Sequence, residues 1–224
     1  MKRALSTACA LSLVAMAGLS AAVSEKLKSR VEESATVLAE IHKAPDKDIP
    51  RELWDRATCV IVIPSVKKAA FVFGGEYGKG LMSCRKGKGG AWSAPVFMQL
   101  QKGSWGLQIG AQSIDLILLV NNERGMKKLL GNKVTLGAEA SVAAGPVGRD
   151  ARAATDAQMN AEILSYSRAQ GLFAGINLSG GVLKPDSDDN EEVYGKKITP
   201  TAILTGSTAP PAATSAFMNA LLRK

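Results

Sequence analysis

Between Thr58 and Leu183 the sequence consists of short β-prone segments punctuated by glycine, and most of the chain's 22 glycines fall there. This pattern is typical of an antiparallel sheet. Glycine inside a strand weakens it, so these glycines predict bulges, tight bends or close backbone approach. We therefore expect an α+β fold whose mainly antiparallel, glycine-rich sheet is curled or closes partly into a barrel. Strands are predicted at residues 58–63, 69–74, 79–85, 95–101, 105–110, 113–120, 133–145, 161–168 and 172–183.

Helical patterns flank and interrupt the predicted sheet. Residues 24–43 carry Leu27, Val31 and Leu38 at helical spacing with charged residues around them, which predicts an amphipathic N-terminal helix. We expect this helix to pack on the domain, and a helix that lies on a membrane is the alternative. Shorter helices are predicted at residues 51–56, 122–130 and 215–222.

Two local patterns compete in residues 155–168. Thr155 and Gln158 match a capping box, which favours a helix from Asp156. Further along, the alternation that ends near Tyr166 favours a strand. We expect a strand in the second half of this segment, followed by a tight turn back along residues 172–176.

The first 22 residues have the features of a secretory signal. Lys2 and Arg3 precede an uncharged run from Ala4 to Leu19, which is too short to span a bilayer comfortably, and small residues follow at 20–22. We expect cleavage after this segment, which would place the protein in the periplasm or outside the cell. A retained N-terminal anchor is the alternative.

The remaining 202 residues suffice for one domain with a substantial core. We expect a helical arm at residues 23–49 that packs on the domain. A single domain at residues 50–195 follows. A C-terminal segment at 196–224, helical near its end, completes the chain.

Basic residues gather at predicted strand ends and loops. Without Lys2 and Arg3 the chain carries 26 basic and 20 acidic residues, a balance that favours anionic partners. If the sheet brings these residues to one rim, they form an anion-binding face at a membrane surface; ordinary solvated loop charge is the alternative. Aromatic residues make up only 5% of the chain, which disfavours base stacking on nucleic acid. The candidate lipid-binding residues are Lys67, Lys68, Arg85, Lys86, Lys88, Arg124, Lys127, Lys128, Lys133 and Arg149.

Two cysteines, Cys59 and Cys84, remain after signal removal. An oxidising compartment permits them to form a disulfide if their strands are neighbours. Two buried free thiols are the alternative, because Cys59 begins an apolar run. Neither cysteine has metal-ligand spacing, and no metal site is expected.

No motif supports catalysis. Asp115 and Glu139 interrupt apolar or small-residue strands and are the one candidate acid–base pair, for an envelope hydrolase. The stronger hypothesis is that a nearby arginine, such as Arg124 or Arg149, holds each carboxylate. We expect no catalytic residues and no cofactor.

Two further motifs resemble ligand loops only partly. Residues 74–80 depart from a phosphate loop because Gly80 follows Lys79, and we expect a hairpin turn there. Asp186, Asp188 and Asn190 imitate the first ligands of a calcium loop, but Glu191 stands where glycine is needed and Lys197 where a bidentate glutamate is needed. A solvated acidic turn is expected instead.

Several motifs in one order resemble the SYLF domain family over residues 50–195. The opening motifs are IPSVKKA at 63–69 and FVFGGEYGKG at 71–80. The later ones are WSAP at 92–95, GLQIGAQ at 106–112, DL at 115–116, NERG at 122–125, LGAEAS at 136–141, AGPVGR at 144–149 and the segment 166–175.

The resemblance implies a lipid-binding function without accepted catalytic residues. Eukaryotic members of the family recognise phosphoinositides and some bundle actin, whereas bacterial members are typically exported. For an exported chain we expect anionic phospholipids or fatty acids as ligands, with peripheral membrane contact. The sequence identifies no protein partner. An outer-membrane β-barrel is an alternative, although few predicted strands reach ten residues and aromatic girdles are lacking.

Overall fold

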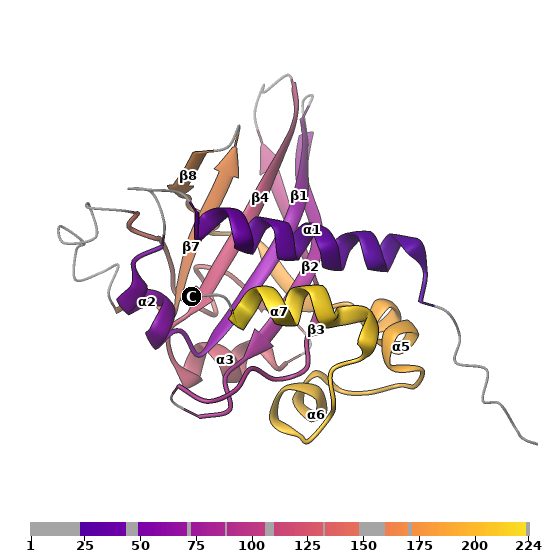
Figure 1. The fold of residues 1–224 in the computed structure, drawn as a ribbon. Coiled ribbons are helices and arrows are strands. Elements are labelled where there is room, and N and C mark those ends of the chain that lie inside the picture. Colours follow the sequence, from indigo (N-terminus) through magenta and orange to yellow (C-terminus); the bar gives the residue numbers. More distant parts are fainter. Residues whose placement is uncertain are drawn as a thin grey trace, which may run out of the picture.

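The computed structural model describes residues 23–43, 49–70, 73–87, 89–105, 110–131, 133–147, 160–169 and 172–222 (Figure 1). The predicted signal segment lies outside these residues. The helices are α1 (Glu25–Ile41), α2 (Arg51–Arg56), α3 (Glu123–Leu129), α5 (Ser187–Tyr194), α6 (Pro200–Thr205) and α7 (Ser215–Leu222), with a 3-10 turn η2 (Ala212–Thr214). The strands are β1 (Cys59–Ala70), β2 (Phe73–Cys84), β3 (Val96–Trp105), β4 (Gly110–Val120), β5 (Val134–Thr135), β6 (Val142–Ala144), β7 (Ile163–Ala169), β8 (Leu172–Gly175) and β9 (Val182–Pro185).

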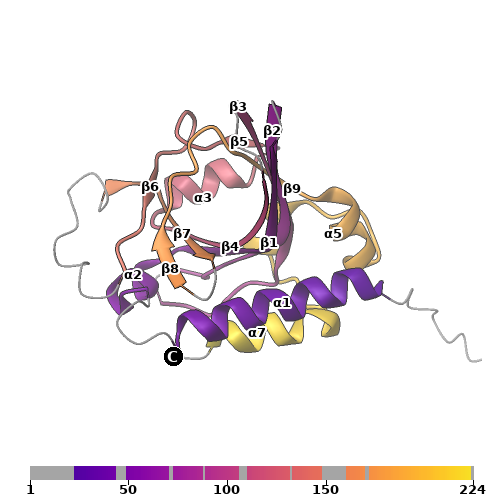
Figure 2. The same cartoon turned by 90° about the horizontal axis from the view of Figure 1, so that it is seen from above.

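The described strands form one sheet in the order β5-β9-β3-β2-β1-β4-β7-β6, with β8 paired to β7. Every pairing is antiparallel except that of β6 with β7. The sheet curls so strongly that α3 lies inside the curve, while α1 and α7 lie outside it (Figure 2). The predicted α+β fold with a curled, mainly antiparallel sheet is confirmed.

Alternation along the central strands separates two apolar cores. Val60 and Val62 of β1 belong to the outer core, which packs against α1 and α7. Ile61 and Ile63 belong to the inner core, together with side chains from α3, α6 and the segment around Leu136. Because both faces are covered, these strands are apolar at successive positions. None of the described helices is long and apolar enough to cross a membrane.

A one-residue bulge bends β1 at Pro64 and Ser65. The register against both β2 and β4 shifts there, and Ser65 has a φ of 51°. Proline cannot donate to the ladder of a central strand, so a bulge is the position where it is tolerated. On β2, a Cβ at Gly80 would lie 1.9 Å from the Val62 carbonyl oxygen, and one at Gly78 would lie 2.6 Å from Ile63 Cγ2. These glycines therefore allow β2 to press against the bulged strand.

The bulge overturns several predicted boundaries. We expected separate strands at 58–63 and 69–74 and a hairpin turn at 74–80, but β1 continues through the bulge and 74–80 lies within β2. The turn prediction was wrong because these glycines serve close strand contact. The break expected after residue 101 is also absent, since β3 runs from Val96 to Trp105.

Other boundaries were confirmed or corrected by smaller amounts. The helices at α1, α2, α3 and α7 and the strand at β7 were confirmed. The long strand expected at 133–145 is divided into β5 and β6 by a turn that contains Gly137, with φ of 85°. The strand expected at 172–183 is likewise divided into β8 and β9, and α5 and α6 were not predicted. The helix expected from Asp156 lies outside the described residues.

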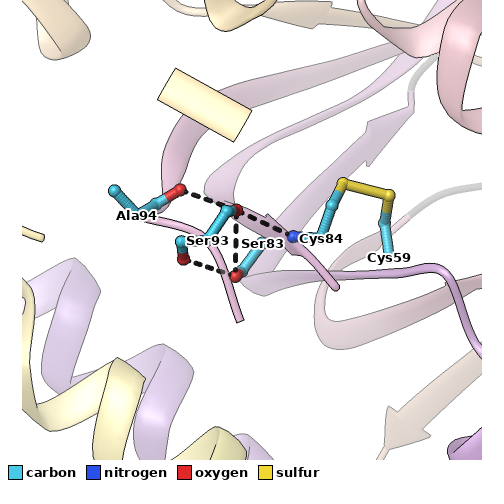
Figure 3. Close-up of a disulfide and its surroundings, with 5 residues drawn as sticks. All are labelled: Cys59, Ser83, Cys84, Ser93 and Ala94. Atoms are coloured by element: carbon cyan, nitrogen blue, oxygen red, sulfur yellow. Dashed lines mark hydrogen bonds between the residues drawn. A yellow bond between two sulfur atoms is a disulfide. The ribbon is translucent and has the colours of Figure 1, made fainter. Parts of the chain in front are cut away.

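Cys59 and Cys84 face each other across β1 and β2 and form a disulfide (Figure 3). Both side chains are buried, with 0% and 1% of their surface exposed. The adjoining turn is fixed by Ser93, whose Oγ accepts a hydrogen bond from the Cys84 amide at 3.0 Å and donates to the Ala94 carbonyl at 3.0 Å. One end of the β1–β2 ladder is therefore cross-linked.

Replacing both cysteines by serine should lower the free energy of unfolding by about 3 kcal/mol, because the cross-link closes a loop across 25 positions. Urea unfolding of the oxidised wild type and the double variant measures this difference. The reduced wild type should fall near the variant. Equal stability of oxidised and reduced wild type would contradict a structural role for the bond.

Gly80→Ala should destabilise the protein by about 3 kcal/mol, because the new methyl group must displace the β1 backbone. Gly103→Ala on β3 is the matched control, since nothing lies within 4 Å of its Cβ position. Thermal and urea unfolding of the two variants should therefore give opposite results, with the control neutral or slightly stabilised. A mild effect at Gly80 would show that β1 can move away.

Candidate functional site

A pocket of about 440 Å³ lies between α1 and the bulged part of β1 and β2. We call it the α1 pocket. Four of its lining side chains are cationic, namely Lys26, Arg30, Lys67 and Lys79. Its lining consists of Lys26, Ser29, Arg30, Glu33, Pro64, Ser65, Lys67, Tyr77, Gly78 and Lys79.

Helical and strand periodicity place these side chains together. On α1, the four lining residues from Lys26 to Glu33 occur at spacings of three and four, which puts them on one face of the helix. On β2, Tyr77 and Lys79 are two positions apart and so share the outer face of the sheet. The bulge brings Ser65 and then Lys67 to the same wall.

An ionic cluster forms the floor of the α1 pocket. Arg30 pairs with Asp189, and Lys79 pairs with both Asp186 and Asp189, at 3.1 Å from the latter. The side chains are 20% exposed or less. Two cations and two carboxylates thus neutralise one another, and the cluster joins α1, β2 and α5.

Burial opposes the charged forms in this cluster, but the pairing is stronger. Burial would raise the pKa of Asp186, yet hydrogen bonds and charge from Lys79 and the contacts with Asp189 hold that pKa below its ordinary value. Burial would lower the pKa of Lys79, whereas both carboxylates raise it above its ordinary value. Asp186 also accepts the Asp189 amide at 3.3 Å and so caps α5.

The charges that remain available are at the rim. Lys26 and Lys67 are exposed, and neither has a carboxylate within 4.0 Å among the described residues. Glu33, the acidic residue of the rim, accepts a hydrogen bond from the Ser29 hydroxyl at 2.8 Å. With the floor neutralised, the rim has a net positive charge and presents ammonium groups beside the hydroxyls of Ser65 and Tyr77.

A second hollow, of about 670 Å³, adjoins the α1 pocket across the outer face of β1, β2, β3 and the start of β9. The two share Lys67 and Tyr77. We call this second hollow the glycine shelf. The other lining residues are Gly75, Glu76, Gln101, Lys102, Gly103, Gly180 and Val182.

The structure does not gather the predicted basic residues on one rim. Lys67 and Lys68 lie in the part of β1 beyond the bulge, opposite Tyr77 and Glu76. Another group lies around the opposite end of the sheet, where Cys59 pairs with both Cys84 and Val120. Its members are Arg85, Lys86, Arg124, Lys127, Lys128 and Lys133, which follow β2 or lie on and after α3. Lys88 and Arg149 lie outside the described residues.

Several of these basic residues have structural partners. Arg85 stacks over the Trp92 ring at 4.1 Å, and burial lowers its pKa, against the opposing charge of Asp55. Lys68 lies 3.5 Å from the buried Glu76 carboxylate.

Two lysines of α3 also form ion pairs. Lys127 lies 3.9 Å from Glu123 in a pair exposed on both sides. Lys128 donates to both oxygens of Glu162, at 2.9 and 2.8 Å. Among the predicted basic residues that the structure describes, Lys67 alone lines the α1 pocket.

Asp115 and Glu139 have no partner in common. Asp115 accepts hydrogen bonds from the Ser65 amide at 2.9 Å and Arg168 Nε at 2.8 Å. An arginine does hold Asp115, as expected, but it is Arg168, and Arg149 lies outside the described residues. Glu139 is exposed rather than buried in a strand, and its pKa is lowered by hydrogen bonds from Thr135, whose amide lies 2.6 Å away. These contacts give both carboxylates structural roles, and the described residues include no cluster suited to a metal ion.

Sequence reasoning missed most of the α1 pocket. The solvated acidic turn was wrong, because Asp186 is only 3% exposed and begins α5. Its position before Asp189 is a capping pattern that could have revealed the helix. The face from Lys26 to Glu33 was visible in the spacing of α1, but nothing local identifies its partner β2.

Residues 101–224 match the Ysc84 family, described as Las17-binding protein actin regulator. This match covers more than half of the chain. The chain belongs to the SYLF (Ysc84) family. The resemblance seen in the sequence is thereby confirmed, and the SYLF motif at residues 63–80 corresponds to the bulge and the glycines that pack against it.

Curated relatives align with most of this SYLF chain. LAS seventeen-binding protein 3 of Saccharomyces cerevisiae is 32% identical over 212 residues, covering 91% of this chain and 46% of that protein. An SH3 domain-containing protein of Schizosaccharomyces pombe is 38% identical over 168 residues, covering 73% and 39%. Human SH3 domain-containing YSC84-like protein 1 is 31% identical over 196 residues, covering 85% and 57%. The SYLF chain therefore spans about half the length of the curated relatives it matches.

The ionic cluster in the floor of the α1 pocket predicts how the free energy of unfolding depends on pH. The pKa of Asp186 is lower in the folded protein than in the unfolded chain, where it is about 4. The stability that the Asp186 carboxylate contributes is therefore present above about pH 4 and is lost as the pH falls through the folded pKa. The raised pKa of Lys79 has the opposite effect on the pH dependence. The stability that charged Lys79 contributes is present below about pH 10 and is lost as the pH rises through its folded pKa.

Asp186→Asn should lower stability at pH 7 by about 3 kcal/mol and reduce the loss between pH 5 and pH 2. Asp188→Asn, an exposed change of the same charge on α5, is the control and should keep the wild-type acid dependence. Chemical unfolding across this pH range measures both effects. Parallel pH curves for wild type and Asp186→Asn would contradict the role of the cluster.

Proposed function

We propose that this SYLF protein is an exported, non-catalytic lipid-binding protein that associates with anionic phospholipid headgroups in the cell envelope. The observation that carries this proposal is the α1 pocket, where Lys26 and Lys67 stand over an internally neutralised floor. Peripheral attachment in the periplasm or outside the cell follows from the predicted signal at residues 1–22.

The donors in the α1 pocket suit a phosphate group. Ammonium groups supply point charges that attract phosphate oxygens, and the hydroxyls of Ser65 and Tyr77 supply hydrogen bonds. Asp186 and Asp189 would repel an anion if they were unpaired, but Arg30 and Lys79 compensate their charge. The pocket volume is within the range of small-ligand sites.

The cations at the opposite end of the sheet have a different part in the proposal. Lys86, Arg124 and Lys133 are exposed and would attract an anionic surface at long range. They do not converge on either hollow. They therefore serve as a measure of general electrostatic attraction, against which the effect of the α1 pocket can be compared.

A protein partner is the second candidate function. It is favoured by the relatives' names, which describe LAS seventeen binding and SH3 domains. Those relatives are about twice as long as the matched region, so their partners need not contact this part. An exported chain would also not meet cytoplasmic actin, and the envelope lipid is the ligand we favour.

The double variant Lys26→Gln/Lys67→Gln should bind vesicles of phosphatidylglycerol and phosphatidylcholine about 30-fold more weakly than wild type, because each lysine near an anionic surface contributes about 1 kcal/mol. Vesicle co-sedimentation at several salt concentrations measures the affinity. Wild type should bind pure phosphatidylcholine poorly.

The matched control is Arg124→Gln/Lys133→Gln, which removes the same charge at the far end of the sheet. It should retain most of the affinity. Equal losses in the two double variants would show that net charge, not the α1 pocket, determines binding. Equal binding of wild type to neutral and anionic vesicles would contradict the headgroup mechanism altogether.

A further inference from the structure

The glycines of the central strands fall into two classes. Gly78 and Gly80 have no room for a side chain, because β1 occupies the space where a Cβ would lie. At Gly103 nothing lies within 4 Å of that position, and at Gly75 only the Lys102 carbonyl oxygen does, at 3.6 Å. Packing therefore explains the first class and leaves the second unexplained, although glycine weakens a strand wherever it occurs.

The two open glycines lie together. Gly75 of β2 is directly opposite Gly103 of β3, and both are exposed. Side chains stand in the next row of the same face, where Lys67, Tyr77, Gln101 and Val182 are successive partners across four strands. The result is a patch of bare backbone bordered by a row of side chains.

An aromatic ring forms the wall of this patch. Tyr77 is 44% exposed, which is unusual for a large side chain in this molecule. Gly180 and Val182 border the hollow from the side of β9, and a Cβ at Gly180 would also meet nothing within 4 Å. Gln101 stands between Tyr77 and Val182, and the CH groups of Tyr77, Val182 and the open glycines supply apolar surface around it that remains in contact with water.

We propose that the glycine shelf receives an acyl chain of the lipid whose phosphate lies in the α1 pocket. This inference rests on the function proposed above. Its physical basis is continuity, because Lys67 and Tyr77 line both hollows, so a ligand can pass from the cationic pocket to the shelf without leaving the surface. The order of cationic pocket and apolar shelf matches the order of phosphate and chain in a phospholipid.

Backbone hydrogen bonding between the two glycines favours a chain over a sugar at that point. The β2–β3 ladder runs continuously from Phe73 to Met82, so the amides and carbonyls between Gly75 and Gly103 are engaged with each other. A sugar lying over these two glycines would find none of the backbone groups between them free to bond its hydroxyls. An acyl chain needs only apolar contact, which a surface without side chains provides along its length.

The test compares a headgroup with and without chains. The probes are glycerophosphoglycerol and dihexanoyl phosphatidylglycerol, the latter kept below its critical micelle concentration, and titration calorimetry on the wild-type protein gives both affinities. The chain-bearing probe should bind at least about tenfold more tightly, because two short chains bury several methylene groups. Gly75→Val or Gly103→Val should reduce this ratio to near one and leave the affinity for glycerophosphoglycerol unchanged.

Gln99→Val is the matched control, since Gln99 lies on the same strand and face as Gly103 but does not line the shelf. It should retain the wild-type ratio. The shelf variants should unfold at the wild-type temperature or above it, because valine favours strands and a Cβ meets open space at Gly103 and only an ordinary contact of 3.6 Å at Gly75. A loss of chain binding in these variants is then separable from a loss of folding.

The outcomes separate the two proposals. If neither probe binds wild type, the headgroup function fails. If both bind equally, or if Gly103→Val leaves the tenfold ratio intact, the headgroup function stands and the shelf proposal is overturned. Binding of a disaccharide that the shelf variants abolish, without a preference for chains, would also overturn it. Loss of both affinities in Lys26→Gln/Lys67→Gln, with loss of the ratio alone in Gly103→Val, supports both proposals.

Discussion

The close approach of β1 and β2 at the bulge is the constraint on which the rest of the structure depends. Gly80 lets the β2 backbone press against Val62, and the extra residue at Ser65 bends β1 where it would otherwise stay straight. Bulges increase local twist, so the sheet curls enough to hold α3 and an inner core. Beyond the bend, the same two strands pass alongside α1 and carry Lys67 and Tyr77 to the pocket.

The ionic cluster under the α1 pocket connects this bend to the chain's C-terminal third. Lys79 lies between two glycines of β2, and its partners Asp186 and Asp189 belong to the start of α5. Buried pairs of this kind contribute little net stability relative to apolar packing, but they require particular partners. Here they fix α1 and α5 against one strand, and they leave the cations of the rim available for a ligand.

The parts of the fold and of the α1 pocket that depend on neighbouring residues could be predicted from the sequence, whereas those that depend on residues far apart in the chain could not. Alternation and glycine content predicted the curled sheet, and local spacing predicted α1 and α3. The predicted strand stopped at residue 63, whereas β1 passes through Pro64, because a bulge accommodates the proline and no local pattern marks a bulge. Arg30 and Asp189 are 159 positions apart, so neither sequence neighbourhood reveals the pair. Lys67 was identified from charge clustering, whereas its companion on α1 was assigned to ordinary helix surface.

The bulge divides the β1–β2 ladder into two parts, and the disulfide cross-links only one of them. The disulfide joins the end at Cys59 and Cys84, where both faces are buried, while the part beyond the bulge projects past α1 (Figure 1). Opening of a ladder proceeds where few buried contacts oppose it, so we expect amide protons near Lys67 and Gly75 to exchange through local fluctuations and those near Val60 through global unfolding. A ligand can therefore displace strands at the pocket end while the cross-linked end preserves the fold.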